Sequence, residues 1–282
     1  MHKAATNTGI PWKVFQQMED LDFADDICLL SNTSSKMQTK LNKIAEVSSK
    51  VGLKINTKKT KFITVNGNGN PEIQINNQSI EKVDKFCYLG SVINEKGGTD
   101  EDIKMRIGKA QYTFNKLSKV WNSNNISRKT KIIIFNSNIK SVLLYGAESW
   151  RDNKTQTKKL QTFINKCLRK ILKVFWPNRI TNLELWEKTN QIPVTQEIKN
   201  RKWKWIGHTL RKDDTDITKE ALEWNPQGTR KKGRPPNTWR RTVLKEAKEL
   251  GKTWSEIKIE AKNRVRWRNL VAALCSTRER RG

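Results

Sequence analysis

The sequence is short of acidic residues and of metal-binding side chains. Its 282 residues hold 28 Asp+Glu against 56 Lys+Arg, which gives a formal net charge of 56 − 28 = +28. The four cysteines and two histidines are dispersed, with no CxxC pair, so they form no zinc ligand set at the usual spacing. Cysteines scattered in this way predict reduced thiols in an intracellular protein.

Long apolar stretches are also missing. Hydrophobic residues make up 35% of the chain, and apolar runs such as 132–135 fall far short of the ~20 residues of a membrane-spanning helix. The first twenty residues contain no continuous apolar stretch of the kind that a secretory signal peptide has. We therefore expect no signal peptide and no membrane partner.

Aromatic and basic residues are plentiful by comparison. With Trp 11 and Phe 8 the chain has enough large apolar surface for small cores, which argues against a wholly disordered polycation. The length suggests one to three domains of about 100–200 residues each. The basic excess predicts a polyanionic partner, because Lys and Arg neutralise phosphates and release their counterions. The alternative is a basic surface that serves solubility alone.

The first third of the chain alternates between strand and helix patterns. Residues 21–30 place an acidic pair between two short apolar runs, which predicts two strands joined by a tight turn. A helix is expected over about 35–50, ending before Gly52, and strands are expected at 53–56 and 62–65. The order strand, turn, strand, helix, strand is that of the second half of a split βαβ arrangement.

Strand patterns continue to about residue 92, and helix patterns follow. Residues 72–75 alternate, Asn76 and Asn77 indicate a turn, and 86–89 begin a hairpin that turns near Gly90. Thr99 and Asp102 then resemble a capping box that opens the first of several helices, and another is expected over 128–145.

The clearest helical periodicity precedes Pro177. Its apolar positions are Leu160, Phe163, Ile164, Cys167, Leu168, Ile171, Leu172 and Phe175. The opposite face carries Lys158, Lys159, Lys166, Arg169, Lys170 and Lys173. This pattern predicts a core-facing helix with a solvated basic face. The same packing is compatible with a basic face that follows the phosphates of a nucleic acid, so the two interpretations do not exclude each other.

The last 82 residues are the richest in basic and tryptophan side chains. From Arg201 to Gly282 there are 23 Lys+Arg and 10 Asp+Glu, with six of the eleven tryptophans. The residues predicted to bind nucleic acid are Lys202, Lys204, Arg230, Lys231, Lys232, Arg234, Arg240, Arg241, Arg266 and Arg268. For Trp203 and Trp267, packing in a core is at least as good an interpretation as stacking on bases. The segment 231–236 is either a basic linker or a weak match to an arm that enters the minor groove.

Three motifs in order carry a family resemblance. Phe23-Ala24-Asp25-Asp26, the segment 52–61 (GLKINTKKTK) and the segment 86–91 (FCYLGS) resemble motifs C, D and E of the reverse transcriptases of non-LTR (LINE-type) retrotransposons. The segments 201–208 and 233–241 look like the C-terminal extension of RTE-like elements. The resemblance therefore covers nearly the whole chain.

The resemblance implies roles for particular residues. Asp25 and, with it, Asp26 would hold the Mg²⁺ ions of a two-metal polymerase, and Lys59 would protonate or steady the leaving pyrophosphate. Tyr88, Leu89 and Gly90 would form the primer grip. The implied partners are an RNA template and a DNA primer or target, which would place the protein in the nucleus.

The resemblance also leaves a gap. Only 24 residues precede Asp25, and the family's motif A aspartate and fingers lie upstream of motif C. We therefore expect an α+β chain that is the C-terminal part of a reverse transcriptase and does not polymerise alone. The expected domains are a partial palm (1–98), a helical thumb-like region (99–199) and a basic nucleic-acid-binding extension (200–282). The alternative is a non-catalytic RNA- or DNA-binding remnant.

Overall fold

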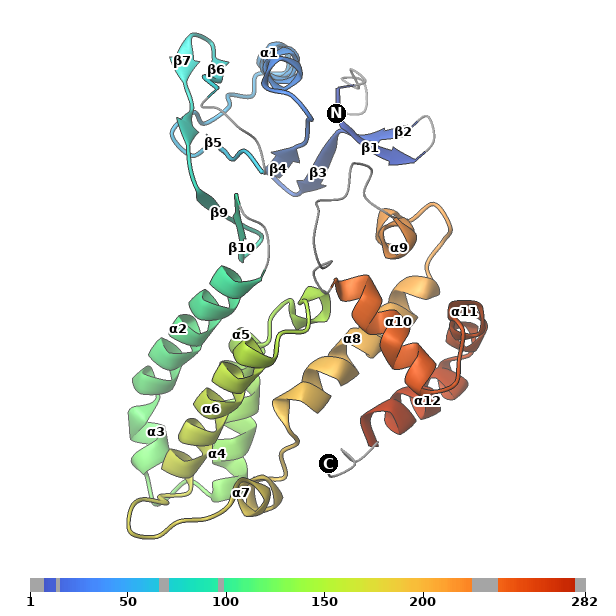
Figure 1. Ribbon diagram of the computed structural model, residues 1–282. Helices are drawn as coiled ribbons and strands as arrows, with labels where there is room; N and C mark the ends of the chain where they lie inside the picture. The colour runs from blue at the N-terminus through green and yellow to red at the C-terminus, as the bar shows by residue number, and fades with distance from the viewer. Residues whose placement is uncertain (1–7, 14–15, 66–70, 96–98, 225–237, 277–282) are drawn as a thin grey trace. The chain divides into compact units, whose positions relative to one another are not determined.

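The computed structural model describes residues 8–13, 16–65, 71–95, 99–224 and 238–276 (Figure 1). The chain divides into two compact units. Unit 1 comprises Met1–Gly97 and Glu223–Gly233, and unit 2 comprises Gly98–Leu222 and Arg234–Gly282. Among the described helices, none is both long and apolar enough to span a bilayer.

Unit 1 contains the strands, which pair two by two, and one long helix. The pairs are β1 (Ile10–Lys13) with β2 (Gln16–Met18), β3 (Asp20–Phe23) with β4 (Asp26–Leu29), β5 (Lys61–Phe62) with β8 (Glu81–Lys82), β6 (Gln74–Ile75) with β7 (Gln78–Ser79), and β9 (Lys85–Tyr88) with β10 (Ser91–Asn94). The order strand, turn, strand, helix is found as predicted, but no strand forms at 53–56. The strand predicted at 62–65 is reduced to β5, which does not join the β3–β4 hairpin. It pairs in parallel with β8 instead, and the Val83 N–H extends that pairing by donating to the Phe62 carbonyl.

Helix α1 (Ser34–Lys50) packs over the small core of unit 1. It begins after Thr33, whose side chain accepts from the Lys36 N–H at 3.3 Å, and it ends before Gly52, which has φ +78° as a C-terminal glycine commonly does. The buried residues of this core are Leu41, Ile73, Ile75 and Ile80. The predicted turn at Asn76 and Asn77 is confirmed, since both have positive φ between β6 and β7.

Within its described residues, unit 2 is helical. Its helices are α2 (Asp100–Lys116), α3 (Ser118–Asn122), α4 (Arg128–Ile134), a π-helical segment (Phe135–Lys140), α5 (Ser141–Leu143), a 3₁₀ turn (Ala147–Ser149), α6 (Lys154–Ile171), α7 (Asn182–Thr189), α8 (Val194–Leu210), α9 (Ile217–Glu223), α10 (Trp239–Glu249), α11 (Trp254–Lys262) and α12 (Arg264–Ser276). The capping box predicted at the start of α2 is wrong. Thr99 makes no side-chain capping bond, and Asp102 is buried, where it accepts from the Trp150 indole at 3.3 Å.

Helix α6 ends earlier than its apolar pattern predicts. Lys173 takes a left-handed conformation (φ +57°), its N–H donates to the Lys170 carbonyl, and the Val174 N–H donates to the Arg169 carbonyl at 2.9 Å. This pair of bonds is a Schellman motif, which stops the helix and turns the chain away. Phe175, predicted as the last core position, is therefore 61% exposed.

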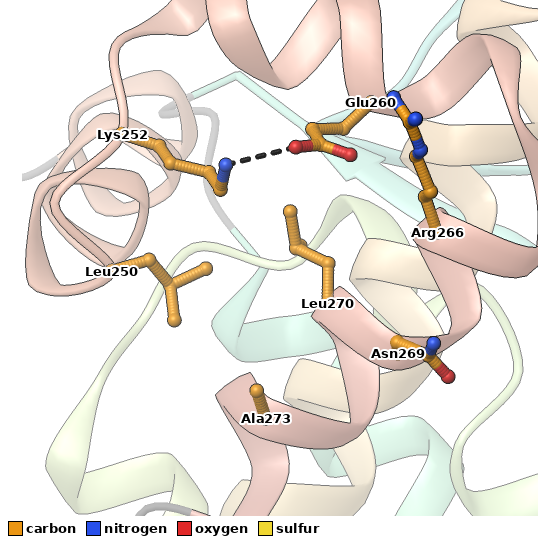
Figure 2. A pocket seen from close by; sticks show the side chains of 7 residues that line it. All are labelled: Leu250, Lys252, Glu260, Arg266, Asn269, Leu270 and Ala273. Atoms are coloured by element: carbon orange, nitrogen blue, oxygen red, sulfur yellow. Dashed lines mark hydrogen bonds and ion pairs between the residues drawn. The ribbon is translucent and has the colours of Figure 1, made fainter.

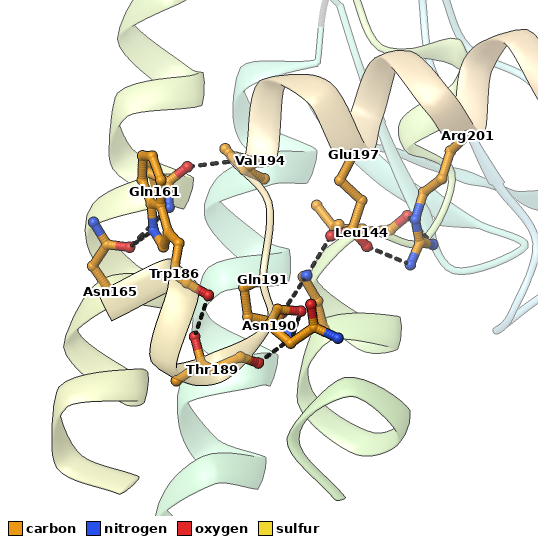
Figure 3. Close-up of polar contacts among 11 residues, drawn as sticks. Leu144, Gln161, Asn165, Trp186, Thr189, Asn190, Gln191, Val194, Glu197 and Arg201 are labelled. Atoms are coloured by element: carbon orange, nitrogen blue, oxygen red, sulfur yellow. Dashed lines mark hydrogen bonds and ion pairs between the residues drawn. The ribbon is translucent and has the colours of Figure 1, made fainter. Parts of the chain in front are cut away.

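Two hydrophobic cores lie within unit 2, and α8 passes from one to the other. The first includes Phe135 and Leu168, and the second includes Trp203 and Trp267. Polar contacts join α6, α7 and α8 (Figure 3). The Asn165 side-chain oxygen accepts from the Trp186 indole at 2.9 Å, and the Gln161 oxygen accepts from the Val194 N–H at 2.7 Å. These bonds fix where α7 and α8 start relative to α6.

Candidate functional site: a carboxylate hairpin and basic helical faces

The β3–β4 hairpin presents Asp25 and Asp26 at its tip. Phe23 pairs with Asp26 across the hairpin, so Ala24 and Asp25 form the two-residue turn. Ala24 has φ +55° and Asp25 is not among the residues with positive φ, which is the pattern of a type II′ turn. Glycine is the usual residue at the position of Ala24, so this alanine is strained, and strained backbone of this kind clusters at functional sites. Both carboxylates are exposed.

Lys40 of α1 anchors the base of this hairpin. Its side chain is 3% exposed and its ammonium donates to the carbonyls of Glu19 and Leu30. It also pairs with the Glu19 carboxylate at 2.6 Å, and that carboxylate accepts from the Thr8 N–H at 3.0 Å. Burial raises the pKa of Glu19, but the hydrogen bonds and charge of Lys40, with the backbone N–H of Gly9, outweigh it and hold the pKa below its ordinary value.

The β9–β10 hairpin rests against the β3–β4 hairpin. The Tyr88 hydroxyl donates to the Leu21 carbonyl at 2.8 Å. Burial raises the pKa of Tyr88, and the charges of Cys28, Asp22 and Asp26 raise it further, so the phenol keeps the proton that it donates. The turn at Leu89 and Gly90 has φ values of +47° and +78°, as a type I′ turn requires. The three residues of the predicted primer grip are thus together, with the hydroxyl of Tyr88 committed to the other hairpin.

Lys59, the predicted motif D lysine, lies in the loop between α1 and β5. Its N–H donates to the side chain and to the carbonyl of Asn56, both at 3.1 Å, so the asparagine organises the turn. The Lys59 side chain is exposed. An exposed lysine on a short loop has the reach that a phosphate contact needs.

Metal binding at the hairpin is limited by the number of carboxylates. Within the described residues there is no group of three or more His, Cys, Asp or Glu side chains that could hold a metal ion. Asp25 and Asp26 supply two acidic side chains. A two-metal polymerase site has to hold two cations, which together stabilise the attacking and the leaving oxygens. The described residues therefore do not fit a complete Mg²⁺ site.

The predicted nucleic-acid-binding residues of the C-terminal segment are found in three kinds of place. Lys204, Arg241, Arg266 and Arg268 are exposed on α8, α10 and α12, and Arg240 is half-buried. Arg230, Lys231, Lys232 and Arg234 lie outside the described residues. The prediction that Lys202 binds nucleic acid is wrong. The residue is 5% exposed and its ammonium pairs with the Glu246 carboxylate at 2.8 Å, so its charge is neutralised inside the protein.

Trp203 and Trp267 are core residues. Their exposed fractions are 0% and 3%, and their ring centroids lie 5.8 Å apart. The Trp267 indole donates to the Trp203 carbonyl at 3.1 Å. Of the two interpretations open for these tryptophans, packing is confirmed, and the arginines beside Trp267 are displayed on the surface because the tryptophan faces inward.

A cluster of arginines gathers where α8 ends and α12 begins. The Arg211 guanidinium donates to the Ala261 carbonyl at 3.0 Å, close to the start of α12. Burial lowers the pKa of Arg211, and the like charges of Arg264 and Arg268 lower it further. Like charges held together repel, and a bound phosphate relieves that repulsion. Arg264 belongs to the basic and aromatic segment 264–268 that the sequence already marks, whereas Arg211 was not singled out from the sequence.

Arg266 lines an open pocket of about 410 Å³ between α12 and the segment that joins α10 to α11 (Figure 2). The other lining residues are Leu250, Lys252, Glu260, Asn269, Leu270 and Ala273. Lys252 and Glu260 pair at 2.9 Å, so they offset each other's charge. The pocket therefore adds the charge of Arg266 to the basic surface. Its lining residues do not form a set of polar groups that point toward a common ligand position.

Comparisons with known proteins find a match over the segment that contains both hairpins. Residues 12–93, which include β3, β4, α1, β9 and most of β10, match the reverse transcriptase (RNA-dependent DNA polymerase) family. Residues 113–145 match a domain of unknown function (DUF6451). The chain is 28% identical over 285 residues to a Caenorhabditis elegans protein named as transposon-derived and uncharacterized, F52C9.6, with 89% of this chain and 94% of that protein aligned. No solved structure matches the chain.

These matches support the conclusion that this chain is a retrotransposon protein related to reverse transcriptases.

Proposed function

We propose that this chain is the nucleic-acid-binding part of a non-LTR retrotransposon reverse transcriptase and that the β3–β4 hairpin faces a primer end. The observation that carries the proposal is the strained turn at Ala24, which presents Asp25 and Asp26 at an exposed tip inside the segment that matches the polymerase family. Lys40 on one side and Tyr88 on the other support this hairpin. The partners we propose are an RNA template and a DNA primer or target.

In this proposal the two hairpins divide the work. Asp25 and Asp26 lie at the tip that faces the primer end. Leu89 with Gly90 contacts the primer backbone, because a tight turn brings the peptide close to a ligand. The Tyr88 hydroxyl orients one hairpin on the other. Lys59, exposed on its own loop, is proposed to meet a phosphate of the nucleic acid.

A second candidate, a non-catalytic RNA- or DNA-binding protein, is favoured by the metal-ligand count. The described residues supply two carboxylates at the hairpin and no cluster of three. The charge of +28 suits binding whether or not catalysis occurs. We therefore propose binding without nucleotide incorporation for the purified chain, and we assign no catalytic step to it.

The test replaces both carboxylates. Asp25→Asn with Asp26→Asn is expected to leave the Kd for a DNA primer annealed to an RNA template unchanged or to lower it slightly, because two negative charges leave a surface that meets phosphates. Binding is measured by fluorescence anisotropy, and primer extension with Mg²⁺ and all four deoxynucleotides is measured in parallel. No extension is expected from either protein.

The control replaces two exposed acidic residues of unit 2, Asp152→Asn with Glu187→Gln. It should change the Kd for the primer–template no more than the Asp25 and Asp26 substitutions do. If the original chain extends the primer and the Asn variant does not, the chain is an enzyme and the second candidate is wrong. A tenfold weaker Kd for the Asn variant, with the control unchanged, would mean that the carboxylates hold nucleic acid themselves.

A further inference from the structure

The loop between α6 and α7 exposes two adjacent aromatic side chains. Phe175 is 61% exposed and Trp176 is 79% exposed. Of the eleven tryptophans, all of which lie in the described ranges, Trp176 alone is exposed. Large aromatic rings bury most of their surface when nothing else requires them outside, so a neighbouring pair at the surface indicates a ligand.

The loop that carries them is fixed at both ends. At its start the Schellman motif holds Lys173 at positive φ, and the Lys173 ammonium donates to the Asn124 side chain at 2.6 Å. At its end the Arg169 guanidinium donates to Asn182 at 2.8 Å, and Thr181 with Glu184 forms a capping box for α7. These bonds hold both ends of the loop before a ligand arrives, which lowers the entropy cost of ordering the loop on binding.

Helix α6, which precedes this loop, carries only positively charged side chains among its charged residues. Its eighteen residues include six cations and no acidic residue. Arg169 is used to anchor the loop, whereas Lys158, Lys159, Lys166 and Lys170 are exposed. No ion pair among the described residues involves these four lysines, which lie along about three turns of α6. The Lys170 ammonium lies 5.8 Å from the ring centroid of Phe114, so this lysine is at the border of the core and the other three face away from it.

We propose that this surface, the exposed lysines of α6 with Phe175 and Trp176, binds single-stranded nucleic acid. The lysines contact successive phosphates, and the two rings stack on unpaired bases. Stacking on aromatic side chains tolerates any base, and a basic track beside it follows the backbone. A duplex fits less well, because its bases are already stacked on each other. The proposal rests on the proposed function in that both expect nucleic acid as the partner.

The test removes the aromatic pair from the full chain. Phe175→Ala with Trp176→Ala is expected to raise the Kd for a fluorescein-labelled 20-nucleotide single strand of mixed sequence at least tenfold, and to change the Kd for the matching duplex less than twofold. Lys166→Gln with Lys170→Gln should instead reduce the slope of log Kd against log salt by about 1.4, at about 0.7 per phosphate of a single strand. Thermal unfolding checks that the exposed substitutions leave the fold intact.

Matched controls come from α2. Tyr112 is 62% exposed and Lys104 and Lys109 are exposed, so Tyr112→Ala and Lys104→Gln with Lys109→Gln remove the same side-chain types from another helix of unit 2. Both should leave the single-strand Kd within twofold. If the aromatic variant binds like the original chain, or loses duplex binding equally, this site is wrong while the proposed function stands. If the original chain binds neither probe, the proposed function fails with it.

Discussion

Replacing Lys40 by alanine is expected to lower the free energy of unfolding of unit 1 by about 3–5 kcal/mol. The ammonium lies almost wholly inside the protein, where it pairs with Glu19 and donates to the carbonyls of Glu19 and Leu30. Without it a shielded carboxylate loses its cation and two carbonyls lose a donor, and each loss carries a desolvation cost. Urea unfolding measures the change in the free energy of unfolding. The Leu30 N–H donates to the Glu19 carbonyl at 2.8 Å, so its hydrogen exchange reports whether the base of the hairpin loosens first.

The control for this prediction is on the same helix. Lys36 is exposed one turn earlier on α1, and Lys36→Ala should change the free energy of unfolding by no more than about 0.5 kcal/mol. Removing both partners, with Lys40→Met and Glu19→Leu, should cost less than Lys40→Ala alone, because no unpaired charge remains. Equal effects of Lys36→Ala and Lys40→Ala would show that Lys40 does not anchor the hairpin.

Gly207→Ala is expected to destabilise unit 2 by about 3 kcal/mol or more. A Cβ at Gly207 would lie 2.0 Å from Nε1 of Trp267, and that ring is buried and bonded to the Trp203 carbonyl. The ring cannot yield without separating α8 from α12, and that separation would move the arginines on α12 away from Arg211. Differential scanning calorimetry measures the loss.

Gly108→Ala is the matched control. Gly108 lies in α2, and a Cβ there would meet nothing within 4 Å, so the change should stabilise the helix by up to about 1 kcal/mol. The two Gly→Ala changes therefore have opposite expected signs. If Gly207→Ala also stabilises the protein, the close packing of α8 on α12 is wrong.

The hairpin and the first helix were predictable because their signals are local. An apolar run, an acidic pair at the turn and a second apolar run specify two strands within ten residues, although the turn itself is Ala24 and Asp25. Helical spacing followed by Gly52 specifies where α1 ends. The pairing of β5 with β8 was not predictable. Each of these strands has two residues, which is too short for any periodicity to show.

Two lysines show what a helical pattern reveals and what it hides. Lys40 lies between Met37 and Leu41 on the apolar face of α1, and Lys202 lies between Ile198 and Ile206 at four-residue spacing on α8. A lysine in an apolar stripe indicates a buried ion pair, and this signal would have removed Lys202 from the expected nucleic-acid contacts.

The partners of these lysines lie beyond what a helical period can specify. Glu19 precedes Lys40 by 21 residues and Glu246 follows Lys202 by 44, with other elements between them. Phe175 escaped prediction for a related reason. The Schellman motif that ends α6 uses Lys173 in a left-handed conformation where glycine is the usual signal, so nothing in the sequence marked the end of the helix.

The salt dependence of primer–template binding tests the central claim most directly. The claim is that this reverse-transcriptase-related chain holds nucleic acid through several phosphate contacts. Its Kd for a DNA primer annealed to an RNA template should rise by about 10³-fold or more between about 50 and about 200 mM salt, as expected for some six phosphates neutralised. A Kd that stays flat over this range, or the absence of binding at the lower salt concentration, would contradict the account.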